Sequence, residues 1–383
     1  MTAAEHYLLL GLRLGRHIDG LVDSYYGPSE LKEQIDGEEL VAPAQLVEDA
    51  AALHESLDDG YLRDQVHGCW TCARVLAGEQ LSYSDEVEGS YGVRPERTPE
   101  VVFENAHAEL DALLPGDGPL SERRQAWRDR HACPGDKAVA VLEELLPLMR
   151  ACTRGVVDLP EGERALLEPV TDEPWWAFNY YLGDLASRVV LNTDVPTTGL
   201  DLIHLAAHEV YPGHHTEHSV KEQLLAREQD RVEETIALVP TPAAVVSEGI
   251  AEVGADVVLD DASREEAYAI LRRHGVEPAD PDLGRRITDQ IDRLRTVSLN
   301  AALMIFEDGM SLEDAQAYVQ HWTLNTPEQA AQSIRFVTDP TWRAYTITYS
   351  AGRDLCGAFI GGDPAKLRRL LSEQVRVSEL LSS

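Results

Sequence analysis

The chain has 383 residues, and its 67 acidic against 33 basic side chains give a net charge of −34. A surface this acidic repels nucleic acid and anionic membranes, so neither is expected as a partner. No apolar run is long enough to cross a bilayer, and the N-terminus lacks the basic leader and cleavage site of a signal peptide. We therefore expect a cytoplasmic protein with a sizeable core, since 44% of its residues are hydrophobic.

The five cysteines do not predict a disulfide framework, because their number is odd and no export signal accompanies them. Cys69 and Cys72 form a C-W-T-C pair. A redox role for this pair is one alternative function. The pair lacks a second such motif, so two buried structural thiols are the simpler interpretation.

The first 165 residues are predicted to form an N-terminal helical lobe (residues 1–165). Leu8, Leu9, Leu12, Ile18 and Leu21 recur at helical spacing. Thr98 is a candidate N-cap for one later helix, with Pro99 at its first helical position. Helices are expected over residues 3–22, 44–58, 61–78, 99–113 and 137–154.

The remainder, residues 166–383, is predicted to form a catalytic lobe, or to continue the first lobe as one domain. Aromatic and β-branched residues are dense over 174–194, and the segment from Ser187 to Asn192 has the composition of a strand. Helices are expected over 199–209, 214–231 and 243–258, and again through the C-terminal third. The predicted fold class is therefore mainly α: a multi-helix, metallopeptidase-like architecture with a small β-sheet beside the active-site cleft.

The motif HEVYPGHH, from His208 to His215, is the strongest sign of chemistry. Glutamate next to a metal-binding histidine is typical of zinc hydrolases, in which a second histidine follows one helical turn later. At about 100° per residue, His214 would point roughly 240° away from His208 on a straight helix. Pro212 and Gly213 predict a break in the helix that brings either His214 or His215 back to the metal.

Other histidine pairs offer alternatives. His204 and His208 are four residues apart, as are His214 and His218. Either pair could hold a metal, and a histidine-rich helical surface without metal is a further alternative.

The segment SEGIAE adds two carboxylates, Glu248 and Glu252, on one face of an apolar helix. A carboxylate in such a helix is destabilising unless it is paired or binds metal. We expect Glu248 to be the third metal ligand and Glu252 to orient a histidine. Two solvent-facing charges are the alternative.

Near the C-terminus, Tyr345, Tyr349 and Arg353 would share one face of a helix, with Arg335 upstream. A tyrosine hydroxyl could stabilise an oxyanion, and an arginine could hold a substrate carboxylate. The strand ending at Asn192 could bind an extended peptide by strand addition.

The motif HEVYPGHH, with LVDSYYGP, SRVVLNTD, SEGIAE and RFVTDPTWRAYTITYSAGR, resembles the bacterial "domain of unknown function eight-eight-five" family. That family is distantly similar to the thimet oligopeptidase and carboxypeptidase Taq zinc peptidases. The resemblance spans most of the chain. It implies that His208 and His214 bind metal, that Glu209 is the general base, and that Glu248 is the third ligand.

Together these features predict a hydrolase with one Zn²⁺ ion that cleaves short peptides by activating water, with Glu209 as base and Tyr349 as oxyanion donor. One alternative is a metal-dependent amidase or esterase acting on a small non-peptide substrate. A second is a metal-binding scaffold without turnover.

Overall fold

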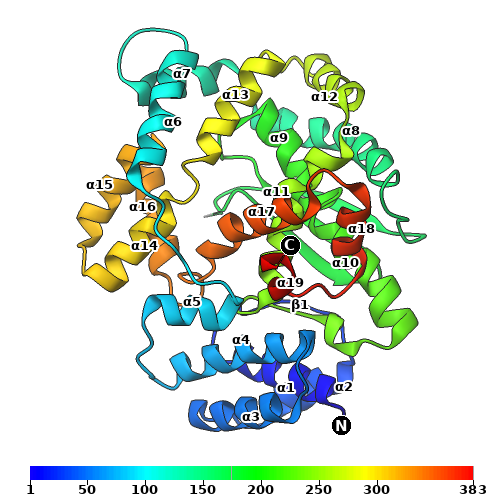
Figure 1. Cartoon of the computed structure of the whole chain (residues 1–383). Helices are drawn as coiled ribbons and strands as arrows, with labels where there is room; N and C mark the ends of the chain where they lie inside the picture. The colour runs from blue at the N-terminus through cyan, green and yellow to red at the C-terminus, as the bar shows by residue number, and fades with distance from the viewer. Residues whose placement is uncertain (174, 383) are drawn as a thin grey trace.

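The computed structural model describes residues 1–173 and 175–382 and is mainly helical, as predicted (Figure 1). The first helices form one end of the molecule, with the strand β1 between them and the rest (Figure 1). This N-terminal part comprises α1 (Ala3–Gly15), β1 (Val22–Tyr25), α2 (Ser29–Gly37), α3 (Pro43–Ser56) and α4 (Tyr61–Leu76).

The remaining helices surround the centre of the molecule. They are α5 (Tyr83–Tyr91), α6 (Glu100–Leu113), α7 (Leu120–Arg130), α8 (Gly135–Thr153), α9 (Gly199–Leu205), α10 (His214–Lys221), α11 (Pro242–Val258), α12 (Asp261–Arg273), α13 (Pro281–Asp292), α14 (Val297–Asp308), α15 (Leu312–Thr323), α16 (Pro327–Thr338), α17 (Thr346–Ile360), α18 (Pro364–Ser372) and α19 (Val377–Leu381). Two π-helical turns (Ala206–Val210 and Glu222–Arg227) and one 3₁₀ turn (Val232–Thr235) join them.

Three small sheets accompany the helices. β1 pairs antiparallel with β7 (Ile236–Leu238), and β2 (Ala132–Cys133) pairs antiparallel with β6 (Thr197–Thr198). In the largest sheet, β5 (Ala186–Asn192) lies between β3 (Arg164–Val170), which is parallel to it, and β4 (Ala177–Gly183), which is antiparallel. The expected strand is therefore the centre of its sheet.

Two clusters of buried apolar side chains form the core. The smaller is built from α1 to α4, and Ile236 and Leu238 of β7 complete it. The larger runs from Tyr83 to Leu380 and includes α8 together with the helices after residue 199. The clusters thus divide the chain before α5, whereas the lobe boundary at residue 165 stays a prediction.

Helices α11 and α17 pack closely because glycines face each other. A Cβ atom on Gly249 would lie 2.4 Å from the backbone oxygen of Gly352, and one on Gly352 would lie 2.4 Å from that of Val245. Only glycine allows backbones to approach this closely. The contact fixes α11, which carries Glu248, against α17, which follows Tyr345.

Two local predictions were wrong. The first helix ends at Gly15 and not at residue 22, because the chain turns there and forms β1. Thr98 does not cap α6: Pro99 takes the N-cap position, and Asn300 holds the backbone of Thr98 by hydrogen bonds of 3.0 and 2.8 Å.

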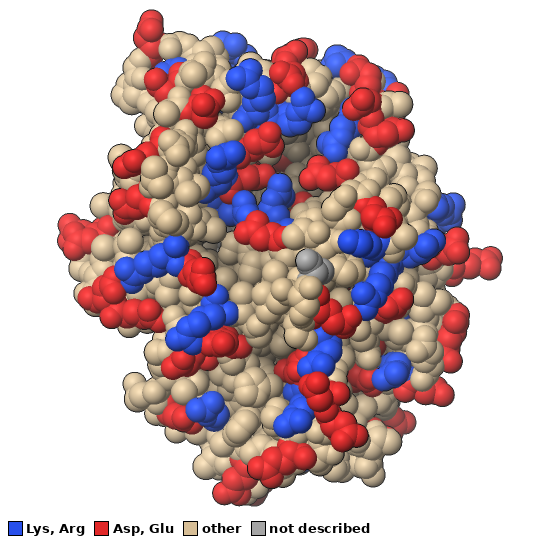
Figure 2. Space-filling model, viewed as in Figure 1, with Lys and Arg blue, Asp and Glu red and all other residues tan. Residues whose placement is uncertain are grey.

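On the face shown in Figure 2, acidic side chains are spread around the whole outline and basic side chains lie among them. Within the described residues, no helix has both the length and the apolar composition required to cross a membrane.

Candidate metal centre

The predicted site residues meet at a pocket of about 590 Å³. Its walls come from the N-terminal helices and from the rest of the chain: Tyr7 and Tyr61 belong to α1 and α4, whereas Glu248 belongs to α11. The pocket therefore lies where the N-terminal helices meet the rest of the chain.

A broken helix places the two histidines side by side. His208 and Glu209 lie in the π-helical turn that follows α9, and α10 begins at His214 after Pro212 and Gly213. A Cβ on Gly213 would lie 1.8 Å from the backbone oxygen of His208, so only glycine fits this turn. The rings of His208 and His214 have centroids 4.8 Å apart. The helix break that Pro212 and Gly213 predicted is thus present.

Glu248 completes a group of three potential metal ligands. Its Oε2 is 3.6 Å from His208 Nε2, and its Oε1 is 3.8 Å from His214 Nε2. Ligand atoms of all three residues lie within 4.8 Å of one another. Two imidazoles and one carboxylate are a ligand set that zinc accepts in hydrolases.

Burial and the contacts between its members set the pKa values of this group. Glu248 is 5% exposed, and its Oε2 has no hydrogen-bond partner among the described residues. Burial raises the pKa of Glu248 to about 7, although His208 and Tyr345 oppose the shift. Burial also lowers the pKa of His214 well below its usual value, which keeps that imidazole neutral, as a metal ligand must be. The residues therefore fit a divalent metal ion.

Glu252 supports His208 from the opposite side. Its Oε1 is 3.5 Å from His208 Nδ1, and Arg353 Nη1 is 3.4 Å from its Oε2. Burial opposes the charged form of Glu252, but His208, His204 and Arg353 lower its pKa to about 2. An ionised carboxylate on Nδ1 fixes the ring orientation of a metal-binding histidine.

One of the alternative histidine pairs from the sequence lies beside this group. His204, His208 and Glu252 form a second group with ligand atoms within 4.8 Å of one another, so the His204 pair shares His208 with the first group. Arg353 also contacts Asp292 Oδ2 at 2.7 Å. Arg353 also donates a hydrogen bond of 3.2 Å to the backbone oxygen of Glu252, so it holds Glu252 in place, and it does not border the pocket.

His215 lies apart from this centre. Its ring is fully buried, with Nδ1 2.8 Å from Ser187 Oγ and Nε2 2.9 Å from Glu163 Oε2. The same oxygen of Glu163 accepts a hydrogen bond of 2.5 Å from Tyr211. Because both ring nitrogens are engaged, the geometry favours His214 over His215 as the ligand. Glu163 therefore contacts Tyr211 before Pro212 and His215 after it.

Glu209 borders the pocket next to the ligand group. Burial raises its pKa, and the positive charge of His208 opposes the shift. Asn179 of β4 donates a hydrogen bond of 2.5 Å to the backbone oxygen of Glu209. A carboxyl with a raised pKa exchanges protons more readily near neutral pH, as a general base requires.

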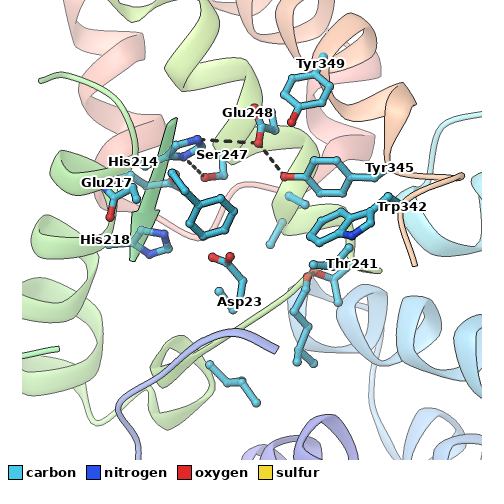
Figure 3. A pocket seen from close by; sticks show the side chains of 18 of the residues that line it. Asp23, His214, Glu217, His218, Thr241, Ser247, Glu248, Trp342, Tyr345 and Tyr349 are labelled. Atoms are coloured by element: carbon cyan, nitrogen blue, oxygen red, sulfur yellow. Dashed lines mark hydrogen bonds and ion pairs between the residues drawn. The ribbon is translucent and has the colours of Figure 1, made fainter. Parts of the chain in front are cut away.

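The two tyrosines have different surroundings. Tyr345 donates a hydrogen bond of 2.6 Å to Glu248 Oε1. Tyr349 is 38% exposed and borders the pocket, with its hydroxyl group pointing toward Glu248 (Figure 3). Tyr345 therefore positions Glu248, whereas the hydroxyl group of Tyr349 borders the pocket.

The remaining predicted residues do not join the centre. Arg335 is exposed at the border of the pocket, where its guanidinium contacts Gln332. Asn192 is buried and donates hydrogen bonds of 2.8 and 3.1 Å to the backbone oxygens of Glu173 and Trp175. Strand addition at β5 was a wrong prediction, because both edges of β5 are already paired.

Sequence reasoning missed Asp23, Asn179 and Glu163. Asp23 borders the pocket from β1, within the LVDSYYGP segment. The alternation of strand β1 is too short to be recognised in the sequence, and the role of Glu163 depends on a contact with a residue 52 positions away.

The cysteine pair does not border the pocket. Cys69 is fully buried in the smaller apolar cluster, and burial raises the pKa of Cys72 to about 12. Both thiols are therefore protonated at neutral pH, which disfavours the redox alternative.

Comparisons with known proteins show a related fold. A "putative lipoprotein" from Colwellia psychrerythraea superimposes with a TM-score of 0.53 and 16% identity, covering 92% of this chain and 68% of that one. A "putative lipoprotein of unknown function" from Shewanella oneidensis gives a TM-score of 0.49 and 13% identity, covering 99% and 72%. No protein-family model matches the chain, and no curated protein is similar to it. The likeness shows the fold alone.

Proposed function

We propose that the chain is a zinc-dependent hydrolase that cleaves short peptides, with His208, His214 and Glu248 as metal ligands. One observation carries this proposal: a broken helix and α11 bring two imidazoles and one buried carboxylate within 4.8 Å of one another. The neighbouring carboxyl of Glu209 provides a candidate general base, which a metal-storage site does not need.

Zinc bound to these residues would act as a Lewis acid and lower the pKa of water toward about 7. Glu248, His208 and His214 would hold it, and Glu252 would keep the His208 ring in place. The resemblance to zinc peptidases seen in the sequence supports the same ligand set.

Glu209 would accept the proton of the attacking water and deliver it to the leaving amine. Its raised pKa favours both transfers, because a base is most effective when its pKa is near the working pH. Asn179 fixes the backbone of this residue through the hydrogen bond to its carbonyl oxygen.

Tyr349 would donate a hydrogen bond to the oxyanion that forms when water attacks. Its hydroxyl group is accessible from the pocket and uses no described partner. Losing one such donor typically lowers the rate by about 10²–10³-fold.

The position of strand β4 beside the pocket favours a peptide as substrate. Ala177, Phe178 and Asn179 are consecutive residues of β4, and all three border the pocket. Since side chains alternate along a strand, three in a row indicate that the edge of β4 faces the pocket. Within the described residues this edge pairs with no other strand. An extended peptide could therefore bind along β4, which replaces the role expected of β5.

Zinc analysis combined with the substitution Glu209→Gln tests the proposal. We expect one zinc per chain in the wild type and in E209Q, hydrolysis of a short-peptide library by the wild type alone, and loss of zinc in His208→Ala. The exposed Glu33 gives a matched control, since E33Q should keep full activity. Full hydrolysis by E209Q, or activity that resists a chelator, would contradict the mechanism. Cleavage of small amides or esters without any peptide would favour the amidase or esterase alternative, and zinc binding without turnover would favour the scaffold.

A further inference from the structure

A row of four aromatic rings borders the pocket where α16 leads into α17. Phe336 lies in α16, and Trp342 follows in the turn between the two helices. Tyr345 and Tyr349 complete the row at the start of α17. Neighbouring ring centroids, taken in this order, lie 6.2, 5.5 and 5.6 Å apart. The four rings, called the aromatic row below, therefore form one continuous surface.

The aromatic row reaches the candidate metal centre. Tyr345 donates its hydrogen bond of 2.6 Å to Glu248 Oε1, and its ring is the neighbour of Trp342 in the row. Figure 3 shows Tyr345 between Glu248 and Trp342. One side chain thus separates Trp342 from a proposed metal ligand. An extended peptide advances only about 3.3 Å per residue, so a substrate side chain against Trp342 belongs to a residue close to the bond that is cleaved.

Accessible surface distinguishes the aromatic row from the aromatic side chains of the core. Phe103 and Tyr91 are 0% and 1% exposed, and neither borders this pocket. Phe336 and Trp342 are partly exposed, and Tyr349 is 38% exposed. Because these three residues border the pocket and keep exposed surface, a ligand in the pocket can contact them.

The turn that carries Trp342 is held by contacts that do not involve its ring. Asp339 Oδ1 accepts hydrogen bonds of 2.8 and 3.3 Å from the backbone nitrogens of Thr341 and Trp342. The next residue, Arg343, forms an ion pair of 2.6 Å with Glu86 of α5. The fold therefore fixes this turn before a ligand binds, which reduces the entropy that binding must overcome.

The geometry of the rings indicates which side chain fits beside them. The ring planes of Trp342 and Tyr345 meet at 89°, and those of Tyr345 and Tyr349 meet at 79°. Both are edge-to-face pairs, in which the positive edge of one ring contacts the negative face of the other. A further aromatic ring can extend such a row by the same contact, whereas an aliphatic side chain cannot.

We propose that the aromatic row binds an aromatic side chain of the substrate within two residues of the scissile bond, with Trp342 as the residue that determines this specificity. The inference rests on the proposed peptidase function and names its substrate class, which is peptides that contain phenylalanine, tyrosine or tryptophan. Trp342 contacts the substrate side chain, whereas the reacting atoms lie at Glu209 and the metal ligands.

Matched peptides test the inference on the zinc-loaded wild-type protein. The peptides differ at one position, which holds phenylalanine, leucine, lysine or alanine, and mass spectrometry locates the cleaved bond. We expect kcat/KM to be higher by about 10–10²-fold for phenylalanine than for alanine, because filling an apolar pocket with a large side chain has an effect of this size. Cleavage should occur within two residues of the phenylalanine. Equal rates for phenylalanine and alanine, or a rate for leucine or lysine as high as that for phenylalanine, would overturn the inference and leave the peptidase proposal standing.

Trp342→Ala tests the assigned residue. W342A should lower the preference for phenylalanine over alanine by about tenfold, whereas W342F, which keeps a ring, should retain most of it. Trp70→Ala is the matched control, because Trp70 is also partly exposed but does not border the pocket. The preference is a ratio measured within each variant, so a loss of folded protein does not change it. A preference that is unchanged in W342A would overturn the assignment.

Binding to the uncleaving variant separates the two proposals. Calorimetry on zinc-loaded E209Q should give a Kd about tenfold lower for the phenylalanine peptide than for the alanine peptide, and adding W342A should remove the difference. If the wild type cleaves no peptide but this difference is found, the aromatic subsite stands and the peptidase proposal fails. Equal Kd values for the two peptides would overturn the aromatic subsite.

Discussion

The glycine contact between α11 and α17 predicts a packing penalty that can be measured directly. In Gly352→Ala the new Cβ would lie 2.4 Å from the backbone oxygen of Val245 and 2.8 Å from the backbone nitrogen of Gly249. Ordinary contact begins at 3.4 Å, so the helices must separate by about 1 Å. Because the obstructing atoms are backbone atoms, no side-chain rotation relieves the clash.

Gly357 lies on the same helix and gives a matched control. Its added Cβ would meet only Val253 Cγ1, at 3.8 Å. Alanine is favoured over glycine in a helix by about 1 kcal/mol, and both variants gain this amount. Overpacking typically costs about 1–3 kcal/mol, and only G352A incurs it. The difference between the two variants therefore isolates the packing term.

Urea unfolding followed by circular dichroism is the appropriate assay. G357A should be more stable than the wild type, and G352A less stable than G357A by about 1–3 kcal/mol at equal m-values. Zinc affinity should fall only in G352A, since the shift separates Glu248 from the segment of Tyr345. Equal stabilities for the two variants would refute the reasoning.

Three further predictions concern the centre and its support. Glu252→Gln should weaken zinc binding by about 10–100-fold while leaving the fold intact, which competition with a chromogenic chelator would show; unchanged affinity would contradict its role on His208. Tyr349→Phe should lower kcat by about 10²–10³-fold with little change in KM, measured by steady-state kinetics, whereas a pure rise in KM would indicate substrate binding instead. Burial opposes the charged form of Glu163, but His215, Tyr211 and Arg150 lower its pKa to about 2, against 4.5 ordinarily. The stability that this ionised carboxylate contributes is present above pH 4.5 and is lost as the pH falls toward 2, so Glu163→Gln should flatten the pH dependence of unfolding in that window.

Much of the fold was predictable because its helices follow local periodicity. The expected segments 44–58, 61–78 and 137–154 correspond to α3, α4 and α8 within two residues at each end. The first helix was overextended because Ile18 and Leu21 continue the apolar spacing. In the structure they pack from the turn that leads into β1, whose partner β7 is more than 200 residues away. Pairing over that distance leaves no local signal.

The candidate metal centre was also predictable only in part. His208, Glu248 and either His214 or His215 could be proposed from the sequence, since a proline and a glycine mark the break and an apolar helix marks the buried carboxylate. Arg353 was misjudged, because a side chain four residues after Tyr349 was assumed to share its surroundings, whereas Glu252 and Asp292 neutralise it. Asp23 could not be found, because only the packing of β1 against β4 brings it to the pocket.

The position of the pocket between two separate apolar clusters has a consequence for how its specificity can change. The residues of the proposed reaction lie on segments that pack in the larger cluster. One wall of the pocket belongs to the first 76 residues, which include β1. Replacements among those residues can therefore reshape the pocket without moving His208, His214 or Glu248. Directed evolution confined to α1, α4 and β1 is therefore the economical way to redirect this scaffold toward new substrates.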